Sequence, residues 1–254
     1  MRAKVVVLGL GEVGLPLLTL SERHHAVVGV DVEGVDADRV GPVEVMHVCY
    51  PFEIDDFVGE TVRYIDALRP SLTIINSTVA VGTTREVHRR SGAPVAHSPV
   101  RGKHTRMLEE LLVYDKFIGG IDERASQLAA EHFQSLGMST VVMPAPETTE
   151  LAKLTETTYF GLLIAWAQEV ERYCEQLGLS YDDIVSFYKE IPFFPAQQYF
   201  PGVIGGHCVM PNVGILGRIG KSTILEAITE SNRAKIELER RRSERQSGHD
   251  SAPE

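Results

Sequence analysis

The chain has 254 residues, of which 43% are hydrophobic, and its formal net charge is -10 at pH 7. This length allows one large domain or two modest ones with a sizeable core. The acidic balance disfavours nucleic acid as the main partner, and no apolar run is long enough to span a membrane. Three cysteines without a Cys-x-x-Cys spacing argue against a disulfide framework and a zinc site, so we expect a cytoplasmic protein without a metal.

The chain begins with the pattern of a dinucleotide-binding unit. An apolar strand, residues 4–8, runs into Gly-x-Gly-x-x-Gly at Gly9, Gly11 and Gly14, and a helical pattern follows. The next strand ends at Asp31, at the distance expected of an acid that contacts a ribose hydroxyl. The glycines admit a pyrophosphate to the helix N-terminus, and the Asp31 carboxylate would repel the extra phosphate of NADP. The pattern therefore predicts NAD as the cofactor.

The first part of the chain alternates between strand and helix patterns. Further strands are predicted at residues 43–49, 72–76, 94–97, 116–120 and 140–143, with helices at 52–68, 83–90 and 123–136. This order predicts an α/β protein with a Rossmann-like, doubly wound parallel sheet over residues 1–146. Residues 32–42 are too few for a helix and a further strand, so one unit at the edge of the sheet is expected to be missing.

The second part is expected to form a smaller, all-helical domain over residues 147–242, followed by a disordered tail, 243–254. Thr148 or Thr149 can cap a helix that runs to Leu177, and a second helix is predicted from about residue 181 to 189. The long helix is apolar on much of its circumference, which predicts burial on more than one side. We therefore expect a homodimer that associates through helix 149–177.

A cysteine stands behind paired glycines in the second part. Cys208 follows Gly205 and Gly206 and precedes a helical pattern, and a helix N-terminus can lower the pKa of a cysteine. A thiolate beside a nicotinamide indicates covalent aldehyde chemistry. The alternative is a small buried hydrophobic residue, because unpaired cysteines are among the most buried side chains.

Four separated segments, in order, resemble the UDP-glucose/GDP-mannose dehydrogenase family, and most closely its UDP-N-acetylmannosamine dehydrogenase branch. They are residues 9–16, 77–84, 150–156 and 202–208, within a resemblance that covers about residues 1–225. Family members oxidise a primary alcohol of a nucleotide sugar to the acid in two NAD-dependent steps. The resemblance implies a shortened relative without the third, sugar-nucleotide-binding domain of full-length members.

By this resemblance Cys208 would be the nucleophile, Lys153 would stabilise an oxyanion or move a proton, and Thr78 would help to hold the catalytic water. We also expect Lys153 in the first turn of its helix, where the dipole disfavours a cation and a functional reason gains weight. The cofactor contacts expected from the motifs and strand ends are Gly9, Gly11, Glu12, Val13, Gly14, Asp31, Tyr50, Ser77 and Thr78.

Three positions depart from the family pattern. Thr157 stands where the family has asparagine, and its hydroxyl can still donate a hydrogen bond. Asn212 replaces an acid four residues after the cysteine, and Val100 replaces a glutamate that follows Ser-Pro. Hydrolysis of an acyl-enzyme by activated water is the step most exposed to these losses.

The basic loop after residue 99 could compensate by binding an anionic substrate. Arg101, Lys103 and His104 can clamp a phosphate or a carboxylate, although a solvated surface loop explains them equally well. His207 beside the cysteine could tune its pKa. The predicted substrate is therefore a small anionic alcohol or aldehyde.

Two other functions stay open at this stage. A single-hydride dehydrogenase of the 3-hydroxyacid type would use Lys153 and leave Cys208 incidental. A non-catalytic NAD-binding partner protein would explain the missing acids as lost chemistry. Turnover with NAD would separate the non-catalytic protein from the two dehydrogenases. Dependence of that turnover on Cys208 would separate the covalent dehydrogenase from the single-hydride one.

Overall fold

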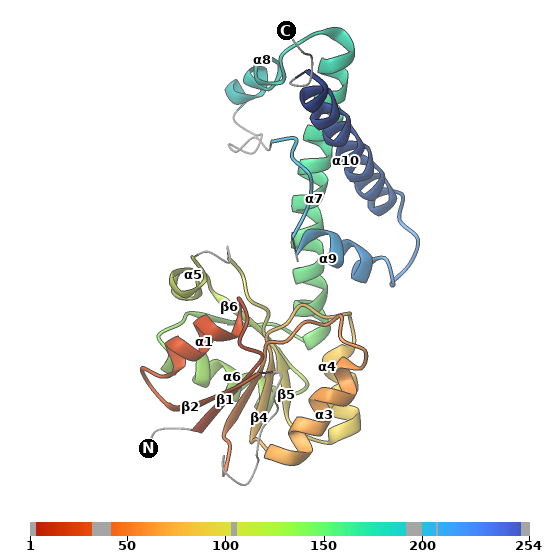
Figure 1. Ribbon diagram of the computed structural model, residues 1–254. Coiled ribbons are helices and arrows are strands. Elements are labelled where there is room, and N and C mark those ends of the chain that lie inside the picture. Colours follow the sequence, from red (N-terminus) through yellow and green to blue (C-terminus); the bar gives the residue numbers. More distant parts are fainter. Residues whose placement is uncertain (1–3, 32–41, 103–105, 192–199, 207, 250–254) are drawn as a thin grey trace. The chain divides into compact units, whose positions relative to one another are not determined.

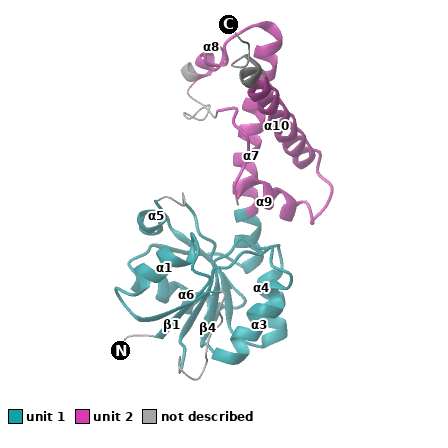
Figure 2. Cartoon of the chain, viewed as in Figure 1, with its two compact units in different colours: residues 1–153 teal, residues 154–254 magenta. Residues whose placement is uncertain are grey.

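The computed structural model describes residues 4–31, 42–102, 106–191, 200–206 and 208–249. Within it the chain divides into two compact units, residues 1–153 and residues 154–254 (Figures 1 and 2). The division lies seven residues beyond the boundary that we expected from the prolines at 144 and 146.

The first unit is built on a seven-stranded sheet in the order β2-β1-β3-β4-β5-β6-β7. The strands are β1 (Lys4–Leu8), β2 (Ala26–Val30), β3 (Val45–Val48), β4 (Leu72–Ile75), β5 (Val95–His97), β6 (Lys116–Gly120) and β7 (Thr140–Val142). The first five strands are parallel, and their inner members are buried on both faces, which accounts for their continuous apolar runs. The α/β, Rossmann-like fold class is confirmed, and β2 is the edge strand beside β1.

One part of the expected sheet is wrong, because β6 is antiparallel to β5 and β7 continues parallel to β6. In its described part, the connection between β5 and β6 contains one α-helix, the seven-residue α5 (Met107–Val113). A helix of that length spans about 10 Å, and β6 starts beside the end of β5, where the Lys116 side chain reaches the carbonyl oxygens of Ser98 and Pro99. The chain therefore returns along the sheet instead of crossing over it.

Helices cover the two faces of the sheet (Figure 1). One hydrophobic cluster joins the sheet to α1 (Gly14–Ser21), α5 and α6 (Glu123–Ser135), and the other joins it to α3 (Phe57–Leu68) and α4 (Thr83–Ser91). Side-chain caps start two of them, since Asp56 accepts a hydrogen bond from Gly59 N at 2.8 Å and Asp122 accepts one from Ala125 N at 2.7 Å.

The second unit is helical in its described part. It contains most of α7 (Pro146–Leu177), then α8 (Tyr181–Ser186) with a 3-10 turn (Phe187–Glu190), α9 (Val209–Leu216) and α10 (Thr223–His249). The helix α10 continues past residue 242, where we expected the tail to begin. The hydrophobic core of the second unit contains Ala165 of α7, Ile228 of α10, and three residues between these helices, Ile204, Val209 and Val213.

Candidate functional site

The glycine motif forms the turn between β1 and α1. Gly9 has a φ of 84°, and a Cβ there would lie 2.7 Å from the backbone nitrogen of Tyr50. A Cβ on Gly14 would collide with the carbonyl oxygen of Gly9. At Gly11, by contrast, an added Cβ would meet no atom within 4 Å. Two glycines are thus required by the turn itself, and the third borders open space at the start of α1, as a bound pyrophosphate requires.

The other expected cofactor contacts follow the ends of the parallel strands. Asp31 is exposed directly after β2, Tyr50 follows β3, and Ser77 and Thr78 follow β4. The Ser77 hydroxyl donates to the carbonyl oxygen of Tyr50 at 2.6 Å, and the Tyr50 hydroxyl pairs with Thr61 at 2.6 Å. Ser77 therefore joins the ends of β4 and β3, and Tyr50 joins the end of β3 to α3. Thr78 is half-buried directly after Ser77.

The start of α7 is bonded to these strand ends through His97, the last residue of β5. Its Nε2 donates to the carbonyl oxygen of Ser77 at 3.1 Å, so its Nδ1 accepts from the Thr149 hydroxyl at 2.7 Å. Burial lowers the pKa of His97 to about 3, and the nearby charges of Lys116 and Lys153 act in the same direction. A neutral imidazole thus joins β4, β5 and α7.

A second connection to α7 comes from Glu150. Its carboxylate is buried and accepts hydrogen bonds from Gly82 N at 2.6 Å, Thr84 N at 2.8 Å and the Thr84 hydroxyl at 2.6 Å. Burial raises the pKa of Glu150, and these hydrogen bonds oppose the rise. Glu150 thereby caps α4 from outside and fixes the rotation of the α7 segment that carries Lys153, one turn further on.

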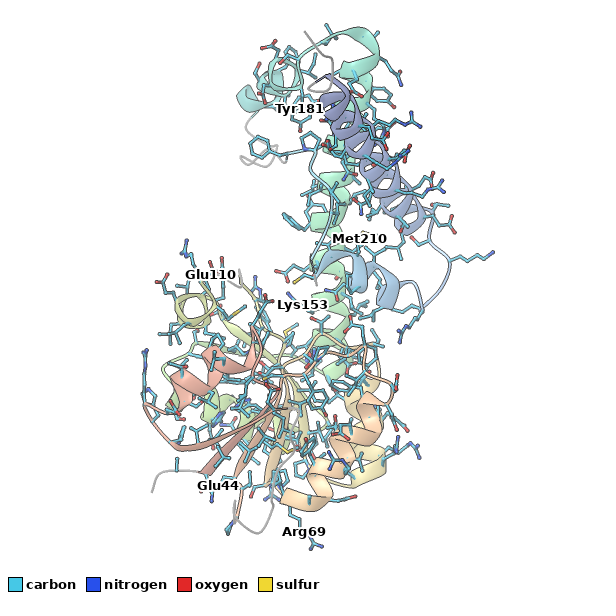
Figure 3. All side chains as sticks on the ribbon, viewed as in Figure 1. Glu44, Arg69, Glu110, Lys153, Tyr181 and Met210 are labelled. Carbon is cyan, nitrogen blue, oxygen red and sulfur yellow. The ribbon has the colours of Figure 1, made fainter. Side chains whose placement is uncertain are left out.

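Lys153 is half-buried in this segment, close enough to His97 and Lys116 for its charge to lower the pKa of both side chains. The expectation that Lys153 lies in the first helical turn is wrong, since α7 begins at Pro146. The dipole effect fades beyond the first turn, so it gives no separate support for a catalytic lysine. The support comes from the position of Lys153 near the C-terminal end of β5 (Figure 3).

The segment after β5 is supported by a second lysine. Lys116 is buried and donates to the carbonyl oxygens of Ser98 at 3.0 Å and Pro99 at 3.2 Å. Burial lowers the pKa of Lys116 to about 7. Val100, at the position of the family glutamate, is buried in the hydrophobic core, so this departure is a packing residue in the present chain.

The guanidinium of Arg101 lies 5.4 Å from the ring centre of Tyr114 and 5.3 Å from that of Phe117. These stacking contacts hold the arginine over two aromatic rings at the start of the basic loop. Lys103 and His104, the other expected substrate contacts in this loop, lie outside the described residues.

The cysteine segment belongs to the second unit. Cys208 is half-buried at the N-cap position of α9, as expected of a cysteine that immediately precedes a helix. Asn212 is buried one turn further on, and its backbone nitrogen donates to the carbonyl oxygen of Cys208 at 3.3 Å. Thr157 is buried on α7. His207 lies outside the described residues.

Sequence reasoning missed the structural roles of three buried polar side chains, Glu150, Lys116 and Asn232. Glu150 belongs to a segment already singled out for the resemblance, but no local pattern shows that it caps another helix. Lys116 begins an apolar strand, where a lysine is ordinarily read as an exposed end. Asn232 lies within a polar, charged helical stretch, and its buried contacts come from residues far away in the sequence.

Across the described parts of the chain, no cluster of three or more His, Cys, Asp and Glu side chains has a metal-binding arrangement. No helix in the same ranges has the length and apolar character needed to cross a membrane.

Comparison with known proteins gives the family of the helical part directly. Residues 147–234 match the model of the UDP-glucose/GDP-mannose dehydrogenase family, central domain. The UDP-N-acetyl-D-mannosamine dehydrogenase of Methanocaldococcus jannaschii is 26% identical to this chain over 258 residues, which cover 81% of this chain and 59% of that protein. The chain thus spans about three fifths of the length of this relative.

Solved structures show the same fold. A UDP-D-ManNAc dehydrogenase from Pyrococcus horikoshii superposes with a TM-score of 0.80 at 22% identity, over 91% of this chain and 68% of that one. The 3-hydroxyisobutyrate dehydrogenase of Mycobacterium tuberculosis superposes with a TM-score of 0.67 at 19% identity, over 94% of both chains. Residues 147–234 thus match the central domain of the UDP-glucose/GDP-mannose dehydrogenase family, and the similarity to UDP-N-acetyl-D-mannosamine dehydrogenase extends beyond them to 81% of this chain.

Proposed function

We propose that this protein is an NAD-dependent oxidoreductase that acts on a CH–OH group of an anionic substrate. The observation that carries the proposal is the junction at the C-terminal ends of the strands. There the open glycine turn precedes α1, and the two buried connections of His97 and Glu150 hold the Lys153 segment to β5 and α4. Ligands of open α/β sheets bind at this edge.

The residues present fit NAD. Gly11 leaves room for the pyrophosphate at the N-terminus of α1, and Asp31 supplies an exposed carboxylate where the adenosine ribose is expected. Bound NAD supplies the hydride acceptor of the reaction. The residues of this chain then have to bind the substrate, stabilise charge on its oxygen and control its protons.

Five residues are proposed for that chemistry. Lys153 would donate a hydrogen bond to the substrate oxygen and stabilise negative charge on it, and Thr78 would orient water near the strand ends. Cys208 would attack the carbonyl carbon of an aldehyde, so that a thiohemiacetal forms with the former carbonyl oxygen protonated. Oxidation of that adduct to a thioester, followed by hydrolysis of the thioester, would release the acid. In these steps Thr157 would donate a hydrogen bond, and Asn212 would stand at the position of the family acid.

A nucleotide sugar is the first substrate to test, since the relative from Methanocaldococcus jannaschii and the structure from Pyrococcus horikoshii are both UDP-N-acetyl-D-mannosamine dehydrogenases. The basic residues Arg101, Lys103, His104 and His207 are proposed to contact the anionic part of the substrate. A homodimer through helix 149–177 is proposed as the assembly, because several large apolar side chains of α7, among them Trp166 and Leu177, are exposed in this chain.

A single-hydride reaction of the 3-hydroxyacid type is the second candidate. The specific observation in its favour is the superposition on 3-hydroxyisobutyrate dehydrogenase along nearly the whole of both chains. In that reaction Lys153 would act and Cys208 would not.

The deciding experiment measures NADH formation with UDP-N-acetylmannosamine, UDP-glucose and 3-hydroxyisobutyrate, in the parent protein and in Cys208→Ala and Lys153→Ala. Two NADH per nucleotide sugar, lost in both variants, supports the first proposal. One NADH from the hydroxyacid, lost only in Lys153→Ala, supports the second. Binding of NAD without turnover on any of the three would contradict both reactions and favour the non-catalytic reading.

A further inference from the structure

Inside the second unit, the segment before Cys208 is an irregular chain held by side chains of two helices. Residues 200–206 form neither helix nor strand, so their backbone groups need partners from elsewhere. Ile204 in this segment is buried, and so is Asn232 of α10. The pairing between these two residues carries the inference.

Asn232 satisfies both backbone groups of Ile204. Its Oδ1 accepts from Ile204 N at 2.7 Å, and its Nδ2 donates to the carbonyl oxygen of Ile204 at 3.0 Å. The Asn232 carboxamide carries its donor and its acceptor on separate atoms of one planar group, so it can bond to both backbone groups of one residue as a neighbouring strand would. The two hydrogen bonds fix both the position and the orientation of the Ile204 backbone relative to α10.

Gln168 of α7 holds the same segment two residues earlier. Its Nε2 donates to the carbonyl oxygen of Gly202 at 2.7 Å, and its Oε1 accepts from the hydroxyl of Ser231 at 3.0 Å. Gln168 is fully buried, and the Ser231 hydroxyl oxygen also lies 3.1 Å from the carbonyl oxygen of Ala165, so its one hydrogen has two acceptors within reach. We call the pair Gln168 and Asn232 the amide clamp.

The amide clamp holds the residues that precede Cys208, and hydrophobic packing holds residues on both sides of it in the chain. Ile204 lies four residues before Cys208, and Val209 directly follows it; both side chains belong to one hydrophobic cluster with Ile228. A Cβ on Gly161 of α7 would lie 2.6 Å from Val209, so α9 approaches the long helix as closely as a glycine permits. Met210, labelled in Figure 3, marks this end of α9.

We infer that Asn232 is a positioning residue for Cys208, with Gln168 as its support. The amide clamp holds the chain that leads into the N-terminus of α9, and thereby sets where the thiol lies at the end of that helix. The inference deepens the proposed function, on which it rests for the role of the thiol.

The test compares three variants with the parent. Asn232→Ala removes both hydrogen bonds to Ile204, and Gln168→Met removes the bond to Gly202 while keeping an apolar chain of similar length. Glu230→Gln is the matched control, since Glu230 lies on the same helix and its ion pair with Arg233 is exposed. Each protein is examined by thermal melting, by the rate at which iodoacetamide alkylates Cys208 from pH 6 to pH 10, and by kcat and KM for NAD. Peptide mass spectrometry assigns the alkylation to Cys208.

We expect Asn232→Ala to fold, to displace the pH profile of Cys208 alkylation to higher pH, and to lower kcat by about 10- to 100-fold at unchanged KM for NAD. Gln168→Met should change both readouts in the same direction and by less, because Gly202 is exposed and water can replace its partner. Glu230→Gln should match the parent.

A folded Asn232→Ala protein with the parental alkylation profile and kcat would overturn the inference. If Asn232→Ala does not melt cooperatively, Gln168→Met decides in the same way. Alkylation needs no turnover, so it tests the clamp even in a protein that oxidises none of the substrates; in that case the proposed function fails and the positioning of Cys208 is still judged.

Discussion

The carboxylate of Glu150 lies 2.6 Å from the hydroxyl oxygen of Thr84, and this contact joins two helices through residues that are 66 positions apart in sequence. The same carboxylate accepts from the backbone nitrogens of Gly82 and Thr84. Glu150 therefore serves as the N-terminal cap of α4, although it belongs to α7.

Replacing Glu150 with alanine should destabilise the protein by about 2 to 4 kcal/mol, because three buried donors lose their acceptor. Glu150→Gln should cost less, since one amide oxygen can still accept. Urea unfolding measures the difference. Glu147→Gln is the control, because its ion pair with Arg85 is at the surface and should change stability by no more than about 1 kcal/mol. Equal midpoints for Glu150→Ala and Glu147→Gln would mean that the cap contributes nothing.

Cofactor selection should depend on Asp31. Calorimetric titration is expected to show tighter binding of NAD than of NADP, since the carboxylate would repel the 2′-phosphate. Asp31→Ser should narrow that difference. Tighter binding of NADP than of NAD by the parent protein would contradict the role of Asp31 in selecting NAD.

The open space at Gly11 gives a separate check on cofactor binding. Gly11→Ala should weaken NAD binding by about 10-fold or more, equivalent to about 1.4 kcal/mol, and leave the melting temperature unchanged. Gly202→Ala serves as its control, because an added Cβ is equally unobstructed there. Loss of NAD affinity in both variants, or in neither, would argue against the glycine turn as the pyrophosphate site.

The covalent step should be visible in the products. Cys208→Ser should form no acid from an aldehyde and should still bind NAD, whereas Lys153→Ala should lower kcat on the order of 100-fold through the loss of one oxyanion donor. Because Asn212 and Val100 cannot deprotonate water, hydrolysis is expected to be slow, with a burst of NADH and an acyl group on Cys208. Rapid quench and mass spectrometry detect that adduct. Full acid formation by Cys208→Ser would refute the thioester route.

Stability should fall as the pH is lowered from 7 to 5. Burial lowers the pKa of His97 and of His132 to about 3, from an ordinary value of 6.5, so below that value the unfolded chain binds protons that the folded protein does not. The stabilising effect is fully present above pH 6.5 and is lost progressively toward pH 3. Each of these two histidines contributes about 1.4 kcal/mol per pH unit, which predicts a loss of about 4 kcal/mol for the two by pH 5. Burial also lowers the pKa of His47 well below 6.5, so His47 adds a loss of about 2 kcal/mol over the same range.

Urea unfolding at pH 7, 6 and 5 measures this slope. His132→Gln should reduce this slope by about a third, because His132 is one of three buried histidines, while His24→Gln, at an exposed position, should leave it unchanged. A slope that is the same in His132→Gln and in the parent would exclude this histidine as its source.

Light scattering at micromolar concentration should give a dimer. Trp166 is 56% exposed on α7, so Trp166→Glu should weaken association if this face meets the partner. Gln134→Glu adds the same charge to an exposed position of α6 and should not. A monomeric parent protein would remove the proposal.

The residues after β1 show which features of this protein can be predicted from local sequence. The glycine spacing and the strand that ends before Asp31 depend on neighbours within about 20 residues, and both occur in the structure as expected. Apolar runs likewise located the seven strands of the sheet, and the inner strands β1, β3 and β4 are mostly apolar because they are buried on both faces. The family resemblance rests on the same kind of local information.

The direction of β6 could not be read in this way, because an apolar strand looks the same in either orientation. The short α5 connection and the contact of Lys116 with the end of β5 decided it. The roles of Glu150 and Asn232 were hidden for a related reason, since each bonds to a backbone more than 25 residues away. The sequence by itself determined the elements, the glycine motif and the family resemblance, whereas only the tertiary structure decided which buried polar groups meet, because those pairings arise when distant segments pack together.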